Sequence, residues 1–209
     1  GGAETARKIL PKLWSSKAGL SVIIHGTYHM LVGTLFPVVF AFGLLSLALL
    51  WFKEQFMAVS GILSWFMGGM AIVGSVYYTA NVLRAWPEQN RLWMHLKFLV
   101  LFPVFISVSM ALSLHNAVAV LDGYLGRKTD FVRTPKYGIT NRKNRPTRRT
   151  YFSGKMDLIA MCELALGLTF AAASVAGILY GNNQFMSIHV MLTAGYFTLF
   201  GYALKSKLS

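Results

Sequence analysis

Charged residues are scarce in this sequence. Only 13% of its 209 residues are charged, whereas 55% are hydrophobic, and the mean hydropathy is +0.52. A soluble globular domain has about a quarter of its residues charged, so this composition excludes an ordinary soluble domain. It predicts an all-α membrane protein that crosses the bilayer several times.

Acidic residues and cysteine are also few. Seven Asp and Glu residues stand against twenty Lys and Arg, which gives a net charge of +13. The basic residues lie in bands between apolar runs and not over one soluble face, so we expect no nucleic-acid partner. The single cysteine, Cys162, excludes an internal disulfide and a Cys-rich metal site, and we expect it to be inert packing.

Motifs that carry catalysis are missing as well. The chain has no Walker loop, zinc-ligand spacing, Ser/His/Asp set or paired-carboxylate motif. We therefore predict no catalytic residue and no metal ligand within it.

Long charge-free runs predict the membrane spans, because a helix needs about twenty apolar residues to cross the bilayer core. About four spans are expected, in two hairpins within residues 21–83 and 156–209. The expected spans are residues 30–52, 57–82, 158–180 and 184–204. The segment "YGNNQ", which begins at Tyr180, supplies the turn of the second hairpin.

The charge-free run at residues 98–121 determines the predicted topology. If it crossed the bilayer, the basic segments on its two sides would lie on opposite faces, against the positive-inside rule. We expect it to be half-inserted, with Pro103 interrupting it and an amphipathic, in-plane helix at its end. All Lys and Arg residues except Lys53 then lie in the cytoplasm, together with both termini. The alternative is a fifth span, which would place the following basic loop outside.

Two further regions are expected at the cytoplasmic face. Residues 1–20 predict an amphipathic interfacial helix, although Pro11 weakens it as one continuous helix. Residues 84–155 form a cytoplasmic and interfacial region, which contains the half-inserted run and a loop at residues 126–150.

The loop at residues 126–150 holds nine Lys or Arg residues. Its densest part, "NRKNRPTRRT", is explained by topology and by attraction to anionic headgroups. The segment "FVRTPK" differs, because it combines an apolar side chain that could anchor the loop, a planar guanidinium donor, a hydroxyl and a mobile ammonium. Those residues are Phe131, Arg133, Thr134 and Lys136. Such a donor set suits a diphosphate, whose charge is met by several hydrogen bonds.

Glu163 lies about two turns inside the predicted span 158–180. An acid at that depth is costly, so it is a candidate channel or intramembrane residue that faces protein or water. The alternative is a carboxylate near enough to the surface to be hydrated or paired with the basic loop.

Five histidines permit a redox interpretation, in which some of them are axial haem ligands. They are His25, His29, His95, His115 and His189. Only His189 lies within a predicted span, while the other four cluster at the predicted cytoplasmic interface. Interfacial hydrogen bonding explains them more simply than haem ligation does.

Three segments carry a resemblance to a known family: "GGAETARKILPKLW", "HGTYHMLVGTLFPVVF" and "SLHNAVAVLDGYLGRKTDFVRTPKYG". In that order they resemble the carboxy-terminal membrane region of bacterial family-2 processive glycosyltransferases, the relatives of cellulose and mannan synthases. Phe131, Thr134 and Lys136 match the F-x-V-T-x-K gating loop of cellulose synthases. Arg133 stands at the Val position of that motif.

The resemblance implies the channel and gating part of an inverting, nucleotide-sugar-dependent polysaccharide synthase in the bacterial inner (plasma) membrane. Thr134 and Lys136 would contact the diphosphate, and the loop would withdraw with the leaving nucleotide. The spans would form or flank a channel for the growing glycan in the lipid bilayer.

The catalytic motifs of that family lie outside this sequence. Its D-x-D motif, general-base Asp and Q-x-x-R-W precede the region that the chain resembles. The implied partner is therefore a cytosolic glycosyltransferase domain, present as a missing N-terminal part or as a separate chain, which would bind the divalent metal, Mg or Mn. Two alternatives are a small haem-holding membrane subunit and a noncatalytic anchor that binds lipid or a partner.

Overall fold

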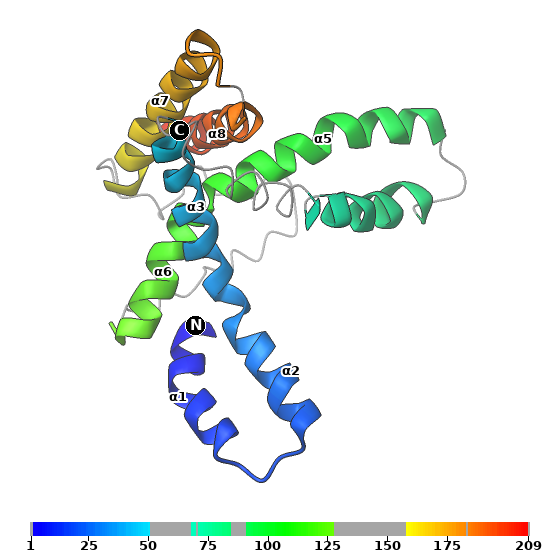
Figure 1. Cartoon of the computed structure of the whole chain (residues 1–209), viewed down its shortest axis with the longest axis vertical. Coiled ribbons are helices and arrows are strands. Elements are labelled where there is room, and N and C mark those ends of the chain that lie inside the picture. The colour runs from blue at the N-terminus through cyan, green and yellow to red at the C-terminus, as the bar shows by residue number, and fades with distance from the viewer. Residues whose placement is uncertain are drawn as a thin grey trace, which may run out of the picture.

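The computed structural model describes residues 2–50, 68–69, 71–84, 91–127, 158–182 and 184–208. This part of the chain contains helices and short connections and no strand, which confirms the predicted all-α class. Its elements are α1 (Gly2–Trp14), α2 (Leu20–Leu31), η1 (Val32–Thr34), α3 (Leu35–Leu49), η2 (Thr79–Leu83), α5 (Arg91–Ala111), α6 (Ser113–Leu125), α7 (Leu158–Leu179) and α8 (Met186–Leu208) (Figure 1).

Four helical stretches in the described ranges are long and apolar enough to cross a membrane. They are Leu20–Leu49, Leu92–Leu125, Leu158–Leu179 and Met186–Lys205. The chain therefore has the helices of a multi-pass membrane protein. The last two stretches agree closely with the predicted spans 158–180 and 184–204.

The other predicted spans agree less directly with the helices. The first candidate stretch begins before residue 30 and contains the 3-10 turn Val32–Thr34. The predicted span 57–82 lies mostly outside the described residues, and its described part belongs to the apolar helix Ala71–Leu83. The stretch Leu92–Leu125 is long enough to cross, so half-insertion of residues 98–121 stays a prediction.

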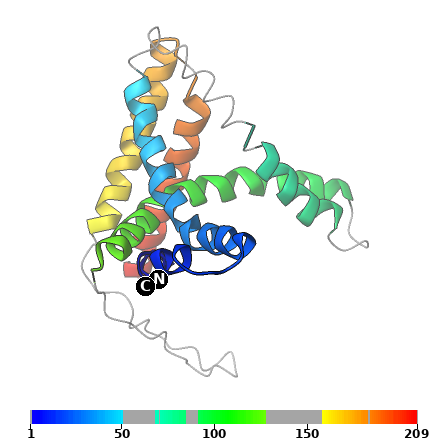
Figure 2. The ribbon, with the colours of Figure 1, turned by 60° about the horizontal axis from the view of Figure 1, so that its bottom comes forward.

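Helices α3, α7 and α8 run side by side as a bundle (Figures 1 and 2). Helices α7 and α8 form an antiparallel hairpin whose turn contains Gly181, as the sequence predicts. At this turn the Asn182 side-chain amide donates to the Leu50 carbonyl oxygen at 3.0 Å. The end of α3 is thereby joined to the α7–α8 turn.

Both chain ends lie toward the opposite end of this bundle from that turn. Figure 2 shows α1, the end of α6 and the C-terminal end of α8 in this region, together with the start of α7. A membrane crossed by the bundle would therefore have both termini on one side. The assignment of that side to the cytoplasm stays a prediction.

Helix α5 runs crosswise to the bundle and packs against α8 (Figure 2). It continues through Pro103, so the prediction that Pro103 interrupts this run is wrong. Proline is tolerated within membrane helices, although it removes the backbone hydrogen bond to the carbonyl of Leu99. The Ser107 hydroxyl donates to the Pro103 carbonyl oxygen at 2.8 Å, one turn farther along the helix. The helical run divides at Leu112 instead.

Helices α1 and α2 pack as a hairpin outside the bundle (Figure 1). The Trp14 indole N–H donates to the Thr27 hydroxyl at 2.9 Å and joins the two helices. Helix α1 continues past Pro11. On its exposed face the hydrogen bond and positive charge of Lys8 hold the pKa of Glu4 below its usual range.

The apolar core lies where α7 and α8 meet the ends of α5 and α6. It consists of Ala111, Leu114, Phe170, Phe185, Ile188, Leu192 and Tyr196. Cys162 is exposed on α7, so the expectation that it packs in the interior is wrong. Successive residues of an α-helix point about 100° apart, so Cys162 projects from a different face than the buried Glu163.

A very close approach between two helix backbones involves Gly195 of α8. A Cβ atom at this position would overlap the Ser107 carbonyl oxygen of α5 and lie 2.9 Å from the Ala111 Cβ. Small residues permit such approaches between membrane helices, where packing and not the hydrophobic effect drives association. The crosswise position of α5 therefore depends on a residue without a side chain.

We expect Gly195→Ala to destabilise the protein by about 1–3 kcal/mol, because the added methyl group must separate α5 from α8. Gly201→Ala on the same helix is the matched control, since a Cβ at Gly201 meets no atom within 4 Å. Thermal unfolding in detergent, followed by circular dichroism, measures both changes. Equal melting temperatures for the two variants would contradict the close approach.

Candidate functional site

The predicted intramembrane acid, Glu163, lies in the second turn of α7 and is 2% exposed. Its Oε1 shares a hydrogen bond with His115 Nε2 of α6, at 2.6 Å between the two atoms. Hydrogen bonds that involve an ionised group are short and strong, and they reduce the cost of burying a carboxylate. The structure thus gives Glu163 a protein partner on a neighbouring helix.

Two more polar side chains lie around this pair. Tyr196 of α8 and Ser113 of α6 are each 1% exposed, and their side chains lie close together. Tyr196 also interacts electrostatically with Glu163. The polar cluster therefore joins α6, α7 and α8. We call Ser113, His115, Glu163 and Tyr196 the inter-helix polar cluster.

The chemistry available to this cluster is the transfer of a proton between His115 and Glu163. Moving one proton from His115 to Glu163 converts an imidazolium–carboxylate pair into an imidazole–carboxylic acid pair, and both forms retain the hydrogen bond. The His115 side chain is 41% exposed, whereas Glu163 is buried, so His115 is the accessible member of the pair.

A second feature is the end of α6, from which the basic loop begins. Helix α6 ends at Leu125 and is capped by Gly126, whose φ of 73° lies in the left-handed region that favours glycine. The Arg7 guanidinium of α1 covers this glycine so closely that a Cβ there would clash with it. Asp122 accepts a hydrogen bond from Arg127 at 3.1 Å. The first residues of the loop are therefore fixed against α1.

Further contacts hold α6 along its length. A Cβ at Gly123 would lie 2.9 Å from the Ala3 Cβ of α1, so these two helices touch. The Tyr124 hydroxyl shares a hydrogen bond with the Thr34 hydroxyl at 2.8 Å, which joins α6 to the start of α3. Helix α6 is thus held by α1, α3 and α7 before the loop begins.

The four predicted diphosphate-binding residues lie outside the described residues. They are Phe131, Arg133, Thr134 and Lys136. The structure therefore positions the start of the predicted gating loop, at Arg127, but not the segment "FVRTPK" itself. Glu163 lies in the described part and within the inter-helix polar cluster.

Three of the five histidines have side-chain hydrogen bonds in the structure. His115 contacts Glu163, His95 Nδ1 contacts the Tyr78 hydroxyl at 3.0 Å, and His189 Nε2 contacts the Ser46 hydroxyl at 3.0 Å. These partners favour hydrogen bonding over axial haem ligation. The described ranges bring together no group of three or more His, Cys, Asp or Glu residues suited to a metal.

Comparison of the chain with protein families, curated proteins and solved structures finds no match.

Sequence reasoning missed the partners of Glu163. A buried acid in a membrane helix needs a polar or cationic partner, and His115 was one of few candidates in the apolar segments. The sequence therefore indicated that Glu163 needs a partner, but it did not indicate which helix supplies that partner. Ser113 and Tyr196 carried no signal, because both residue types are common in apolar helices.

We expect His115→Ala to destabilise the protein by on the order of 3 kcal/mol, because it leaves the buried Glu163 carboxylate without its partner. The double variant His115→Ala with Glu163→Gln should recover part of this loss, since the buried group is then neutral. Thermal unfolding of the wild type, both single variants and the double variant gives the coupling between the two positions. Additive losses would contradict a direct energetic contact.

Proposed function

We propose that this chain is the membrane channel and gating part of an inverting, nucleotide-sugar-dependent polysaccharide synthase. In this proposal a cytosolic glycosyltransferase domain is its partner and binds the nucleotide sugar and the divalent metal. The resemblance of its three segments to bacterial processive glycosyltransferases is the sequence basis. The observation that carries the proposal is the packing of α6 against α1.

This packing determines where the predicted gating loop leaves the membrane part. Gly123 and Gly126 of α6 lie against Ala3 and Arg7 of α1. In this proposal residues 1–20, the expected interfacial helix, seat the catalytic domain on the bilayer. A loop that begins beside α1 therefore starts next to the place where a nucleotide-sugar pocket is expected.

The proposed chemistry of the loop is electrostatic. The acceptor hydroxyl attacks the anomeric carbon of the sugar, the bond to the nucleotide diphosphate breaks, and a base on the catalytic domain takes the proton. Thr134, Lys136 and Arg133 would donate hydrogen bonds to the diphosphate as its negative charge increases. Phe131 would anchor the loop in its inserted position.

The geometry supports a positioning role for Glu163. It is buried and bonded to His115, and this contact links α6 to α7. These two helices precede and follow the predicted gating loop in the sequence. The pair would therefore hold α6 and α7, the helices before and after the loop, in place while the loop itself moves.

We expect Lys136→Ala in the complete synthase to lower polymer synthesis by about tenfold to a hundredfold, because a donor to the leaving diphosphate is lost. Lys143→Ala is the matched control, since this lysine belongs to the part of the loop that topology explains. Incorporation of radiolabelled sugar into polymer, with nucleotide affinity measured in parallel, tests the prediction.

A different outcome would contradict the gating role. Unchanged turnover and nucleotide affinity in Lys136→Ala would exclude it, as would equal losses in Lys136→Ala and Lys143→Ala. Scrambling "FVRTPK" at constant charge distinguishes the two views further. A noncatalytic anchor tolerates this change, whereas a gating loop loses activity.

A further inference from the structure

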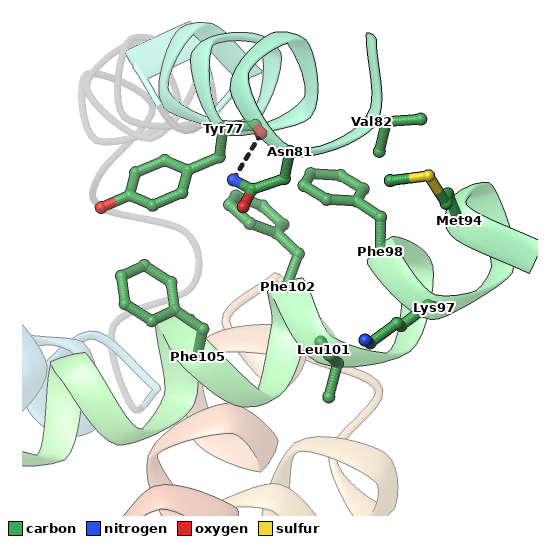
Figure 3. A pocket seen from close by; sticks show the side chains of 9 residues that line it. All are labelled: Tyr77, Asn81, Val82, Met94, Lys97, Phe98, Leu101, Phe102 and Phe105. Atoms are coloured by element: carbon green, nitrogen blue, oxygen red, sulfur yellow. Dashed lines mark hydrogen bonds between the residues drawn. The ribbon is translucent and has the colours of Figure 1, made fainter. Parts of the chain in front are cut away.

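A groove outside the bundle lies between α5 and the helix that includes Ala71–Leu83 (Figure 3). Its volume is about 300 Å³, at the lower end of ligand sites in proteins. Aromatic rings from both helices line it, and Asn81 and Lys97 are its polar residues. The rings are those of Tyr77, Phe98, Phe102 and Phe105.

The walls of this groove are fixed by contacts between the two helices. The Tyr78 hydroxyl and His95 Nδ1 share a hydrogen bond at 3.0 Å. The Phe98 and Phe102 rings stack with their centroids 5.0 Å apart, and Tyr77 lies at the same centroid distance from Phe105. The aromatic surface is therefore ordered before any ligand arrives.

The backbone on one side of the groove is unusual. Residues Thr79–Leu83 form a π-helical turn, and Asn81 lies within it. Such turns occur as single bulges in α-helices, frequently at functional sites. The Asn81 side-chain N–H donates to the Tyr77 carbonyl oxygen at 2.9 Å, and this bond holds the amide over the aromatic rings.

Lys97 gives the groove its charge. Its side chain is exposed and lies beside Leu101 at the groove (Figure 3). Within the described ranges, the ion pairs found do not include Lys97. An ammonium next to an aromatic wall complements a ligand that combines an anionic group with an apolar chain.

The surroundings of the groove indicate that such a ligand comes from the membrane. Trp93, Leu99 and Val100 of α5 are 61%, 66% and 66% exposed. Apolar side chains at that exposure suit contact with lipid, and tryptophan is enriched at the membrane–water interface. A soluble anion would not require the aromatic wall, and a neutral apolar chain would not require Lys97.

We propose that this groove binds an anionic phospholipid, with the phosphate at Lys97 and the first part of an acyl chain along the aromatic rings. The site is independent of the proposed synthase function, because it involves neither the predicted gating loop nor the inter-helix polar cluster. It lies at the junction of α5 with the preceding helix and would fix these two helices to the bilayer.

Lipid binding by the purified chain tests the site. The protein in neutral detergent is titrated with dioleoyl phosphatidylglycerol or dioleoyl phosphatidylcholine, and bound lipid is counted by native mass spectrometry. We expect tighter binding of phosphatidylglycerol, and Lys97→Gln should weaken it about fivefold, the contribution of one lysine to an anionic lipid. Binding of phosphatidylcholine should stay unchanged in this variant.

Two more variants distinguish lipid binding in the groove from electrostatic attraction of anionic lipid to the protein surface in general. Lys12→Gln is the matched control, because Lys12 is an exposed lysine on α1, and it should leave both affinities unchanged. Leu101→Trp fills the groove while keeping Lys97, so it should weaken both lipids. Inorganic phosphate at the same concentration should not displace phosphatidylglycerol, since it lacks the acyl chain.

The proposal is overturned if Lys97→Gln binds phosphatidylglycerol like the wild type. Equal weakening of phosphatidylglycerol binding by Lys97→Gln and Lys12→Gln would mean that only the overall charge of the protein matters, and this would also overturn the proposal. Full lipid binding by Leu101→Trp would overturn it as well. Circular dichroism and gel filtration identify a misfolded variant. If Leu101→Trp misfolds, the comparison of the two lysine variants still decides the outcome.

Discussion

The carboxylate of Glu163 is buried among apolar helices, and its hydrogen bond to His115 joins α7 to α6. A charged or polar group in this position is tolerated only with a partner, because the surroundings offer little solvation. Helix α6 is therefore held at a fixed place on the bundle. The chain leaves α6 toward the basic loop at Gly126, which the Arg7 guanidinium of α1 covers.

Other polar contacts fix the remaining helix ends in the same manner. Asn182 joins the α7–α8 turn to Leu50, and Tyr124 joins the end of α6 to Thr34 at the start of α3. Apolar side chains gain little from packing on one another when lipid is the alternative, so directional hydrogen bonds and close backbone contacts specify the arrangement. The bundle is accordingly held by a few contacts at its two ends and by the inter-helix polar cluster between them.

The periphery of the molecule is organised differently. Helix α5 extends away from the bundle, and its outer half packs through aromatic rings on the helix Ala71–Leu83. This outer part presents many exposed apolar side chains, whereas α1 and α6 bring the loop start and the N-terminal helix together. A region with many exposed apolar side chains and the region that holds the start of the loop are thus separated within the described part of the chain.

The sequence by itself determined the helical membrane class and the hairpin of α7 and α8, because long charge-free runs have one stable solution in a bilayer. It also singled out Glu163 as a residue that needs a partner. Only the tertiary structure decided that this partner is His115, that α5 passes through Pro103, and that Cys162 faces outward. These outcomes depend on which helices are neighbours and on how each helix is rotated about its axis. Charge-free runs show the length and composition of a helix. They do not show which helices are its neighbours or how it is rotated about its axis.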